Sequence, residues 1–141
     1  MMNILQIIAA LIAVSIPTIA TAGGIDITVH VVGIEKQKGE VFAGLYDAST
    51  WRNDHFLSAA HVVVDGPETT LHLVAPSPGK YAIKMFHDLD GTGKLARNFL
   101  GIPTEPYAFS NNVKGRTGLP EFGAAAFDVG VDGAKLEVHM P

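Results

Sequence analysis

The sequence predicts an all-β protein, a seven-stranded antiparallel β-sandwich, immunoglobulin-like or transthyretin-like, with one long ordered loop. Short segments with a hydrophobic period of two recur along the chain and are separated by turns rich in Gly, Pro and Asp. This pattern is typical of sandwich strands. No strand pattern is followed by the helical pattern that a parallel βαβ unit requires.

The first 22 residues are predicted to be a signal peptide. The uncharged apolar run 4–16 is followed by Pro17 and by a small-x-small cleavage site, Ala-Thr-Ala, at 20–22. The alternative is a membrane anchor, but the run is short for a bilayer span and no basic stop-transfer cluster follows it. We expect a periplasmic or secreted protein with one domain over 23–141 and no stable membrane anchor after cleavage.

Composition excludes several classes of protein. The 141 residues include no Cys and carry a formal net charge of −4. Without cysteine the chain has neither disulfides nor a lipoprotein anchor, so its stability has to come from the core. Nothing resembles a basic stripe, and nucleic acid is not an expected partner.

The expected strands begin with 25–31, where apolar residues occupy the odd positions. In the second, 40–47, Val41 and Leu45 take one face while Phe42 and Tyr46 take the other. The remaining strands are expected at 61–65, 69–74, 81–87, 123–129 and 135–140.

Residues 49–60 interrupt the strand pattern. Ser49 or Thr50 is a suitable cap for a short helix. We expect Trp51 and Phe56 to pack against the sandwich. The alternative is that these two rings form an exposed platform for a sugar or a peptide.

The long loop is expected from Asp88 to about Pro120. Loops of this length in compact domains are usually functional or disordered. Its composition is not that of a disordered tail, since it contains apolar side chains that a folded loop would bury. These are Leu95, Phe99, Leu100, Ile102, Tyr107 and Phe109.

The start of this loop has the spacing of the front half of a calcium-binding loop. Asp88 and Asp90 would supply carboxylates, Thr92 a hydroxyl or main-chain oxygen, and Lys94 its carbonyl, with Gly93 permitting the turn and Leu95 anchoring it. The back half excludes an EF-hand, because Ala96 and Phe99 stand where further ligands are needed. Two readings stay open. One is a looser calcium site closed by Asn98, Asp47 or main-chain carbonyls, and the other is an acidic turn without metal.

The run HDLDGTGKLARNFLGIPTEPYAFSNN, from His87 to Asn112, resembles a bacterial secreted family, domain of unknown function 2141. The resemblance extends through 38–47, 78–82 and 115–127. In this family Asp is common where the chain has Ala96, and Gly is commoner where it has Pro106 and Ala108, so one candidate metal ligand is missing. The resemblance implies export and a β-sandwich, and it implies no reaction.

The sequence favours a non-enzymatic binding or structural module for a small ligand, a glycan or a protein, with calcium as its one candidate cofactor. We expect no catalytic residue and a ligand-binding rim on the long loop. The rim residues are His87, Arg97, Asn98, Tyr107, Phe109, Asn111 and Asn112. One alternative is a small hydrolase that uses His87 with Asp88 or Asp47. Another is addition of a partner's strand to an exposed sheet edge. The sequence indicates no oligomeric state.

Overall fold

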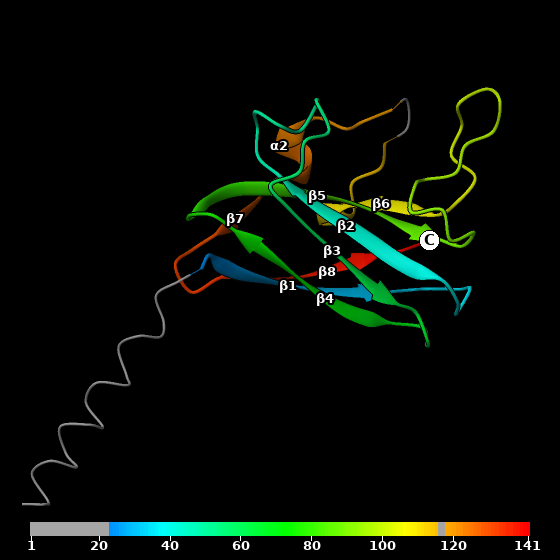
Figure 1. Ribbon diagram of the computed structural model, residues 1–141. Coiled ribbons are helices and arrows are strands. Elements are labelled where there is room, and N and C mark those ends of the chain that lie inside the picture. Colours follow the sequence, from blue (N-terminus) through cyan, green and yellow to red (C-terminus); the bar gives the residue numbers. More distant parts are fainter. Residues whose placement is uncertain (1–22, 116–117) are drawn as a thin grey trace, which may run out of the picture.

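The computed structural model describes residues 23–115 and 118–141, so the predicted signal peptide lies outside the described residues. Two sheets pack face to face (Figure 1). One has three strands in the order β4-β1-β8, and the other has the order β3-β2-β5-β6 with β7 also paired to β5. The predicted all-β, sandwich-like fold is confirmed.

The strands are β1 (Ile25–Val32), β2 (Glu40–Tyr46), β3 (Ser58–Val63), β4 (Thr69–Ala75), β5 (Gly79–Asp88), β6 (Tyr107–Phe109), β7 (Phe127–Val129) and β8 (Ala134–His139). The helical elements are a short 3-10 helix η1 (Ser110–Asn112) and a helix α2 (Phe122–Ala125). The described residues thus form eight strands and not the predicted seven. The additional strand, β6, lies inside the predicted long loop, because three residues are too few for a period of two to be recognised.

One strand pair departs from the antiparallel prediction. β1 and β8 are parallel, with Ile27 opposite Ala134 and Val32 opposite His139. A parallel pair needs a long connection, and here the rest of the chain provides it. The absence of βαβ spacing therefore did not exclude a parallel pair between the first and last strands.

The main core lies between the two sheets. Strand residues of alternating phase point into it, as the period of two requires. From the three-stranded sheet come Ile27, Val29, Val31, Leu71, Leu73 and Val138, and from the larger sheet Val41, Leu45, Ile83 and Met85, all buried. A second, smaller cluster of Tyr46, Trp51, Ala82 and Ala125 lies around the ends of β2 and β5.

The helix predicted within 49–60 is not formed. Residues 48–54 make turns, because the Asp47 carboxylate accepts the main-chain N–H groups of Ser49 and Thr50 and fixes a local turn in place of a helix cap. Trp51 packs as predicted and is 1% exposed, whereas Phe56 is 58% exposed. Within 23–115 and 118–141, no helix has the length and hydropathy needed to cross a bilayer.

Candidate functional site

An aromatic row crosses the outer face of the five-stranded sheet, the face turned away from the three-stranded sheet. His61, Phe42, Phe86 and Tyr107 lie opposite one another on β3, β2, β5 and β6. The Phe42 ring stacks on both neighbours, with centroid distances of 5.0 Å to His61 and 5.3 Å to Phe86. The solvent-facing side of an antiparallel sheet usually alternates to polar residues. An aromatic row there indicates a contact surface.

In the next row, β5 carries a lysine between Gly44 of β2 and Phe109 of β6. Lys84 lies opposite Gly44, and its Nζ donates hydrogen bonds to the Trp51 carbonyl at 2.6 Å and to Asp54 Oδ1 at 2.8 Å. Nζ also lies 4.3 Å from the centroid of the Tyr46 ring. Lys84 thus ties the turn after β2 to the sheet, through an ion pair and a cation–π contact.

Tyr46 titrates far from its ordinary range. Burial, and then the negative charge of Asp54, raise its pKa to about 12. The phenol therefore stays protonated at physiological pH.

Two loops rise from the five-stranded sheet, one after β2 and the other after β5, at opposite ends of these antiparallel strands (Figure 1). One joins β2 to β3 and the other joins β5 to β6. Two hollows of about 400 and 650 Å³ adjoin each other along Asp54, Lys84, Leu95 and Arg97, and together they make up the space between the two loops. We call this space the outer-face cleft. Its floor is formed by Phe42, Lys84, Phe86, Tyr107 and Phe109, and its walls by Arg52, Asp54 and Phe56 on one side and Leu95, Arg97 and Ile102 on the other.

Among the described residues that line the cleft, one basic side chain has no carboxylate partner. Arg52 pairs with Glu121 at 2.9 Å and Lys84 pairs with Asp54. Arg97 donates to the Gly101 carbonyl at 3.0 Å, and within the part of the chain that is described it joins no ion pair. This local positive charge contrasts with the net charge of −4 of the whole chain.

Three of the predicted rim residues meet in this cleft. Arg97, Tyr107 and Phe109 line the same hollow. Tyr107 and Phe109 project from the two ends of β6, and their ring centroids are 5.8 Å apart.

The side chains of the other four predicted rim residues form hydrogen bonds with the protein's own main chain. His87 is 1% exposed on the inner face of β5, where its Nε2 donates to the Lys38 carbonyl at 2.6 Å. The Asn98 side chain accepts the N–H groups of Leu100 and Ile102. Asn111 donates to the carbonyls of Ala124 and Ala126, and Asn112 accepts the N–H of His139.

A carboxylate cluster lies at the base of the loop between β5 and β6. One carboxylate oxygen from each of Asp88, Asp90 and Glu105 lies within 4.8 Å of the others. Asp88 is 2% and Glu105 7% exposed, while Asp90 is open to solvent. The predicted pair of aspartates is therefore joined by a glutamate that the calcium-loop spacing could not reveal. The sequence contains one indication of this third carboxylate, because Glu105 is the first acidic residue after Asp90.

The buried carboxylates are compensated by main-chain N–H groups. Asp88 Oδ1 accepts the N–H of Gly91 at 3.0 Å, and its Oδ2 accepts the N–H of Gly93 at 2.9 Å. The two Glu105 oxygens accept the N–H groups of Leu89 at 2.6 Å and Ala96 at 2.9 Å. Such charge-assisted bonds satisfy a buried carboxylate and fix the path of the loop.

Asp90, Thr92 and Lys94 form the exposed side of the cluster. The Thr92 hydroxyl donates to Asp90 Oδ1 at 2.8 Å and also lies 3.0 Å from the Lys94 carbonyl oxygen. The hydroxyl of Thr92, followed by its N–H, holds the pKa of Asp90 below its ordinary value.

The donor set of the cluster matches a hard divalent cation, since carboxylate and carbonyl oxygens are the ligands that calcium and magnesium prefer. Among the described residues, none of the three carboxylates joins a salt bridge with Lys, Arg or His. Both Asp88 oxygens and Glu105 Oε1 accept one N–H group each and retain a lone pair for a metal ion.

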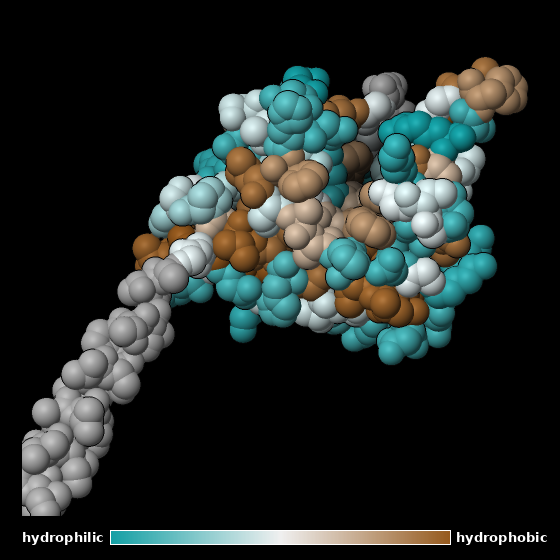
Figure 2. All heavy atoms as spheres, viewed as in Figure 1, coloured by the Kyte–Doolittle hydropathy of each residue, from teal (hydrophilic) through white to brown (hydrophobic). Residues whose placement is uncertain are grey.

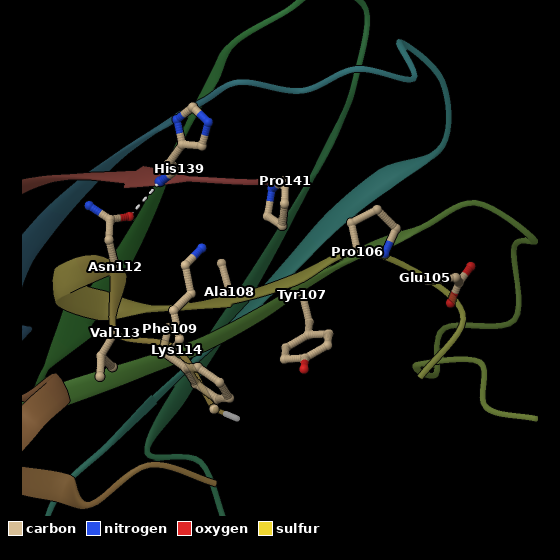
Figure 3. Close-up of a pocket in the computed structure, with 11 residues that line it drawn as sticks. Glu105, Pro106, Tyr107, Ala108, Phe109, Asn112, Val113, Lys114, His139 and Pro141 are labelled. Carbon is tan, nitrogen blue, oxygen red and sulfur yellow. Dashed lines mark hydrogen bonds between the residues drawn. The ribbon is translucent and has the colours of Figure 1, made fainter. Parts of the chain in front are cut away.

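A separate groove of about 450 Å³ follows the free edge of β6 (Figure 3). β6 pairs with β5 on one side only. On the other side the groove is bounded by η1, by Lys114 and by the chain end after β8, where Figure 3 shows the Asn112 side chain bonded to the His139 main chain.

Comparison with known proteins gives one result. A family model described as "Uncharacterized protein conserved in bacteria (DUF2141)" matches residues 29–137. The match begins within β1 and ends within β8, so it includes the aromatic row and the carboxylate cluster. No curated protein and no solved structure matches the chain.

Proposed function

The chain belongs to the DUF2141 family of proteins conserved in bacteria, and on that premise we propose that it is an exported, non-enzymatic binding module whose ligand site is the outer-face cleft. The observation that carries the proposal is the aromatic row on the solvent side of the sheet, walled by two loops. Concave sites with apolar floors and a few polar groups are where proteins bind small molecules.

The lining of the cleft points to a class of ligand. The rings of Phe42, Phe86 and Tyr107 offer flat apolar surface to a planar or cyclic group. Arg97 offers a guanidinium without a carboxylate partner in the described chain. A guanidinium binds carboxylates, sulfates and phosphates through paired hydrogen bonds. The proposed ligand is therefore a small anion with a flat apolar body, such as an aromatic acid or an acidic sugar.

Calcium at the carboxylate cluster is the second part of the proposal. Asp88, Asp90 and Glu105 would hold the ion, with the main chain around Thr92 and Lys94 as a further source of oxygen. Three carboxylates within 4.8 Å repel one another, and a divalent cation would remove that repulsion. The cluster lies at the base of the loop that carries Arg97, so calcium would stabilise one wall of the cleft.

Export is the third part, and its support is the sequence of residues 1–22. A periplasmic or secreted location would place the acidic loop in a compartment richer in calcium than the cytoplasm. The hydrolase alternative receives less support from the geometry. His87 lies on the core side of β5 with its Nε2 donating to a carbonyl, while its neighbour Asp88 belongs to the opposite face.

The test uses a pair of fluorescent probes that differ in charge. 8-Anilinonaphthalene-1-sulfonate is a flat apolar anion, and N-phenyl-1-naphthylamine is a closely similar neutral molecule. We expect the wild-type protein to bind the anion at least tenfold more tightly. Arg97→Met should abolish most of that preference, because the guanidinium supplies it.

Lys94→Met is the matched control, since it removes the same charge from the same loop at an exposed residue that does not line the cleft. It should leave the preference for the anion unchanged. Equal affinity for both probes in the wild type, or equal losses in the two variants, would contradict an anion site in the cleft.

A further inference from the structure

One acidic side chain lies among the basic side chains of the outer-face cleft. Of the described residues that line the cleft, Arg52, Lys84 and Arg97 are basic, whereas Asp54 is the single acidic residue. In Figure 2, hydrophilic atoms predominate on the turn after β2, and apolar atoms lie between that turn and the loop after β5. A carboxylate in a site for anions opposes binding, so the place of Asp54 calls for a physical explanation.

Lys84 is held in position by groups other than Asp54. Its Nζ donates to the Trp51 carbonyl at 2.6 Å and lies 4.3 and 4.9 Å from the ring centroids of Tyr46 and Trp51. The Lys84 side chain is 18% exposed. An ammonium group has three donors, so the bond to Asp54 adds to a position that the carbonyl and the two rings already define. The ammonium would therefore stay at the floor of the cleft without Asp54.

Asp54, in contrast, depends on this one contact. Its side chain is 79% exposed, and within the described chain Lys84 Nζ, at 2.8 Å, is the single hydrogen-bond partner of its carboxylate. The backbone of Asp54 has φ +63°, in the left-handed region that costs free energy for a residue with a Cβ. Strain of this kind persists only where nearby contacts hold it, and it is frequent in ligand clamps and switch segments. Asp54 is thus the partner that can be replaced.

The contact also indicates the chemistry of the group that would replace Asp54. The position beside Lys84 Nζ already accepts a carboxylate. Arg97 also lines the junction of the two hollows, and among the described residues it joins no ion pair. Asp54 is tied to its turn and contacts one of these two cations. The carboxylate of a free ligand can lie where both cations attract it.

We propose that Asp54 is an internal competitor in the cleft, whose carboxylate holds the Lys84 ammonium until the carboxylate of a ligand replaces it. This inference rests on the proposed ligand site in the outer-face cleft. It narrows the ligands from anions in general to carboxylic acids with an apolar body. The competition lowers the affinity for every anion, because only the fraction of molecules in which Asp54 has left Lys84 is ready to bind.

The test uses the full chain and three probes with the same apolar body. These are 2-naphthoate, 2-naphthalenesulfonate and the neutral 2-naphthamide, and their affinities are measured by NMR titration. Asp54→Asn should bind 2-naphthoate about tenfold more tightly than the wild type, because Lys84 then has no competing carboxylate. The affinity for 2-naphthamide should stay constant, since a neutral amide does not compete for the ammonium. Asparagine also tolerates the left-handed backbone of position 54.

Asp128→Asn is the matched control. Asp128 pairs with Lys80 at 2.8 Å and its side chain is 81% exposed, so the change removes the same charge from a similar pair outside the cleft. It should leave all three affinities unchanged. In a Lys84→Met background, Asp54→Asn should give little gain for 2-naphthoate, because the ammonium for which Asp54 competes is absent.

Salt separates competition from long-range repulsion and does not depend on the folding of Lys84→Met. At 1 M salt the Debye length is about 3 Å, and only contacts that are partly buried keep their strength. The gain in Asp54→Asn should therefore remain at this salt concentration. A gain that disappears would show that Asp54 merely repels anions from a distance.

Two further outcomes would overturn the internal competitor. The first is an unchanged or lower affinity of Asp54→Asn for 2-naphthoate, and the second is an equal gain for 2-naphthamide, which would make Asp54 a steric barrier. An equal gain for 2-naphthalenesulfonate would overturn the restriction to carboxylic acids. If Asp54→Asn gives no gain while Arg97→Met still abolishes the preference for anions, the competitor fails and the ligand site stands. If no probe binds to the wild type or to Asp54→Asn, both fail.

Discussion

Glu105 accepts the main-chain N–H of Leu89 at 2.6 Å, across 16 positions of the sequence. Its second carboxylate oxygen accepts the N–H of Ala96, so one side chain ties the start of the loop to its middle. Arg97 and Ile102, which form one wall of the cleft, follow the segment that Glu105 holds. A residue outside the calcium-loop spacing thus determines the shape of the region.

Calcium should stabilise the protein through the exposed member of the cluster. We expect millimolar calcium to raise the melting temperature by several degrees over EDTA, since a ligand at 100 times its dissociation constant contributes about 2.7 kcal/mol. Asp90→Asn should lose this response without loss of stability in EDTA, because Asp90 is exposed. Asp132→Asn, at an exposed turn elsewhere, should respond like the wild type. Identical wild-type curves in calcium and EDTA would leave the cluster as an acidic turn.

Gly39 and Gly91 offer a comparison of backbone strain with steric clash. Both have φ near +75°, at +73° and +75°. A Cβ on Gly39 would collide with the Asp88 carbonyl, whereas one on Gly91 would meet nothing within 4 Å. Gly91→Ala should cost about 1 kcal/mol for its left-handed backbone. Gly39→Ala should cost at least about 2 kcal/mol more in urea unfolding, and equal losses would show that the Asp88 carbonyl moves freely.

Ser110 should be far less tolerant of substitution than its size suggests. Its hydroxyl is fully buried, donates to the Ala125 carbonyl at 2.6 Å and accepts the N–H of Ile83 at 2.9 Å. Ser110→Ala leaves two buried polar groups without partners, so we expect a loss of about 2–4 kcal/mol in urea unfolding. Ser49→Ala, at an exposed hydroxyl, should change stability much less. A loss below about 1 kcal/mol at Ser110 would mean that water replaces the hydroxyl.

Alkaline pH should destabilise the protein through Tyr46. Its pKa is raised to about 12 in the folded state, against about 10 in an unfolded chain. The protonated phenol is therefore favoured by folding. The protonated Tyr46 therefore contributes its full share of folding stability below pH 10, and this stabilisation is lost as the pH rises from 10 towards 12. Between these values the urea midpoint of the wild type should fall more steeply than that of Tyr46→Phe, and parallel profiles would contradict the raised pKa.

The sequence predicted well where the physical signal is local. Strict alternation over 25–31 identified β1, because a strand with one buried face must alternate. A short helix was expected where the structure has turns at 48–54. The Asp47 side chain accepts nearby main-chain N–H groups, and such bonds compete with helix formation.

The candidate site was less predictable, because its parts meet only in the folded chain. Hydrophobicity alone predicted burial for both Tyr107 and Phe99. Tyr107 lines the cleft, whereas Phe99 is 95% exposed beside the turn in which Asn98 accepts the N–H groups of Leu100 and Ile102. His87 was a candidate ligand-binding residue in the sequence, but the alternation of side chains along β5 points it towards the core.

The parallel pairing of β1 with β8 has a consequence for how the protein is made. The first strand obtains its second neighbour only from the last strand, and the ladder is completed by the bond from the Met140 N–H to the Val32 carbonyl. The three-stranded sheet therefore cannot form completely until the segment that contains β8 has been made. Contacts between distant parts of a sequence also make folding slow. Removal of β8 should therefore leave one edge of β1 unpaired and lower the stability of the whole three-stranded sheet.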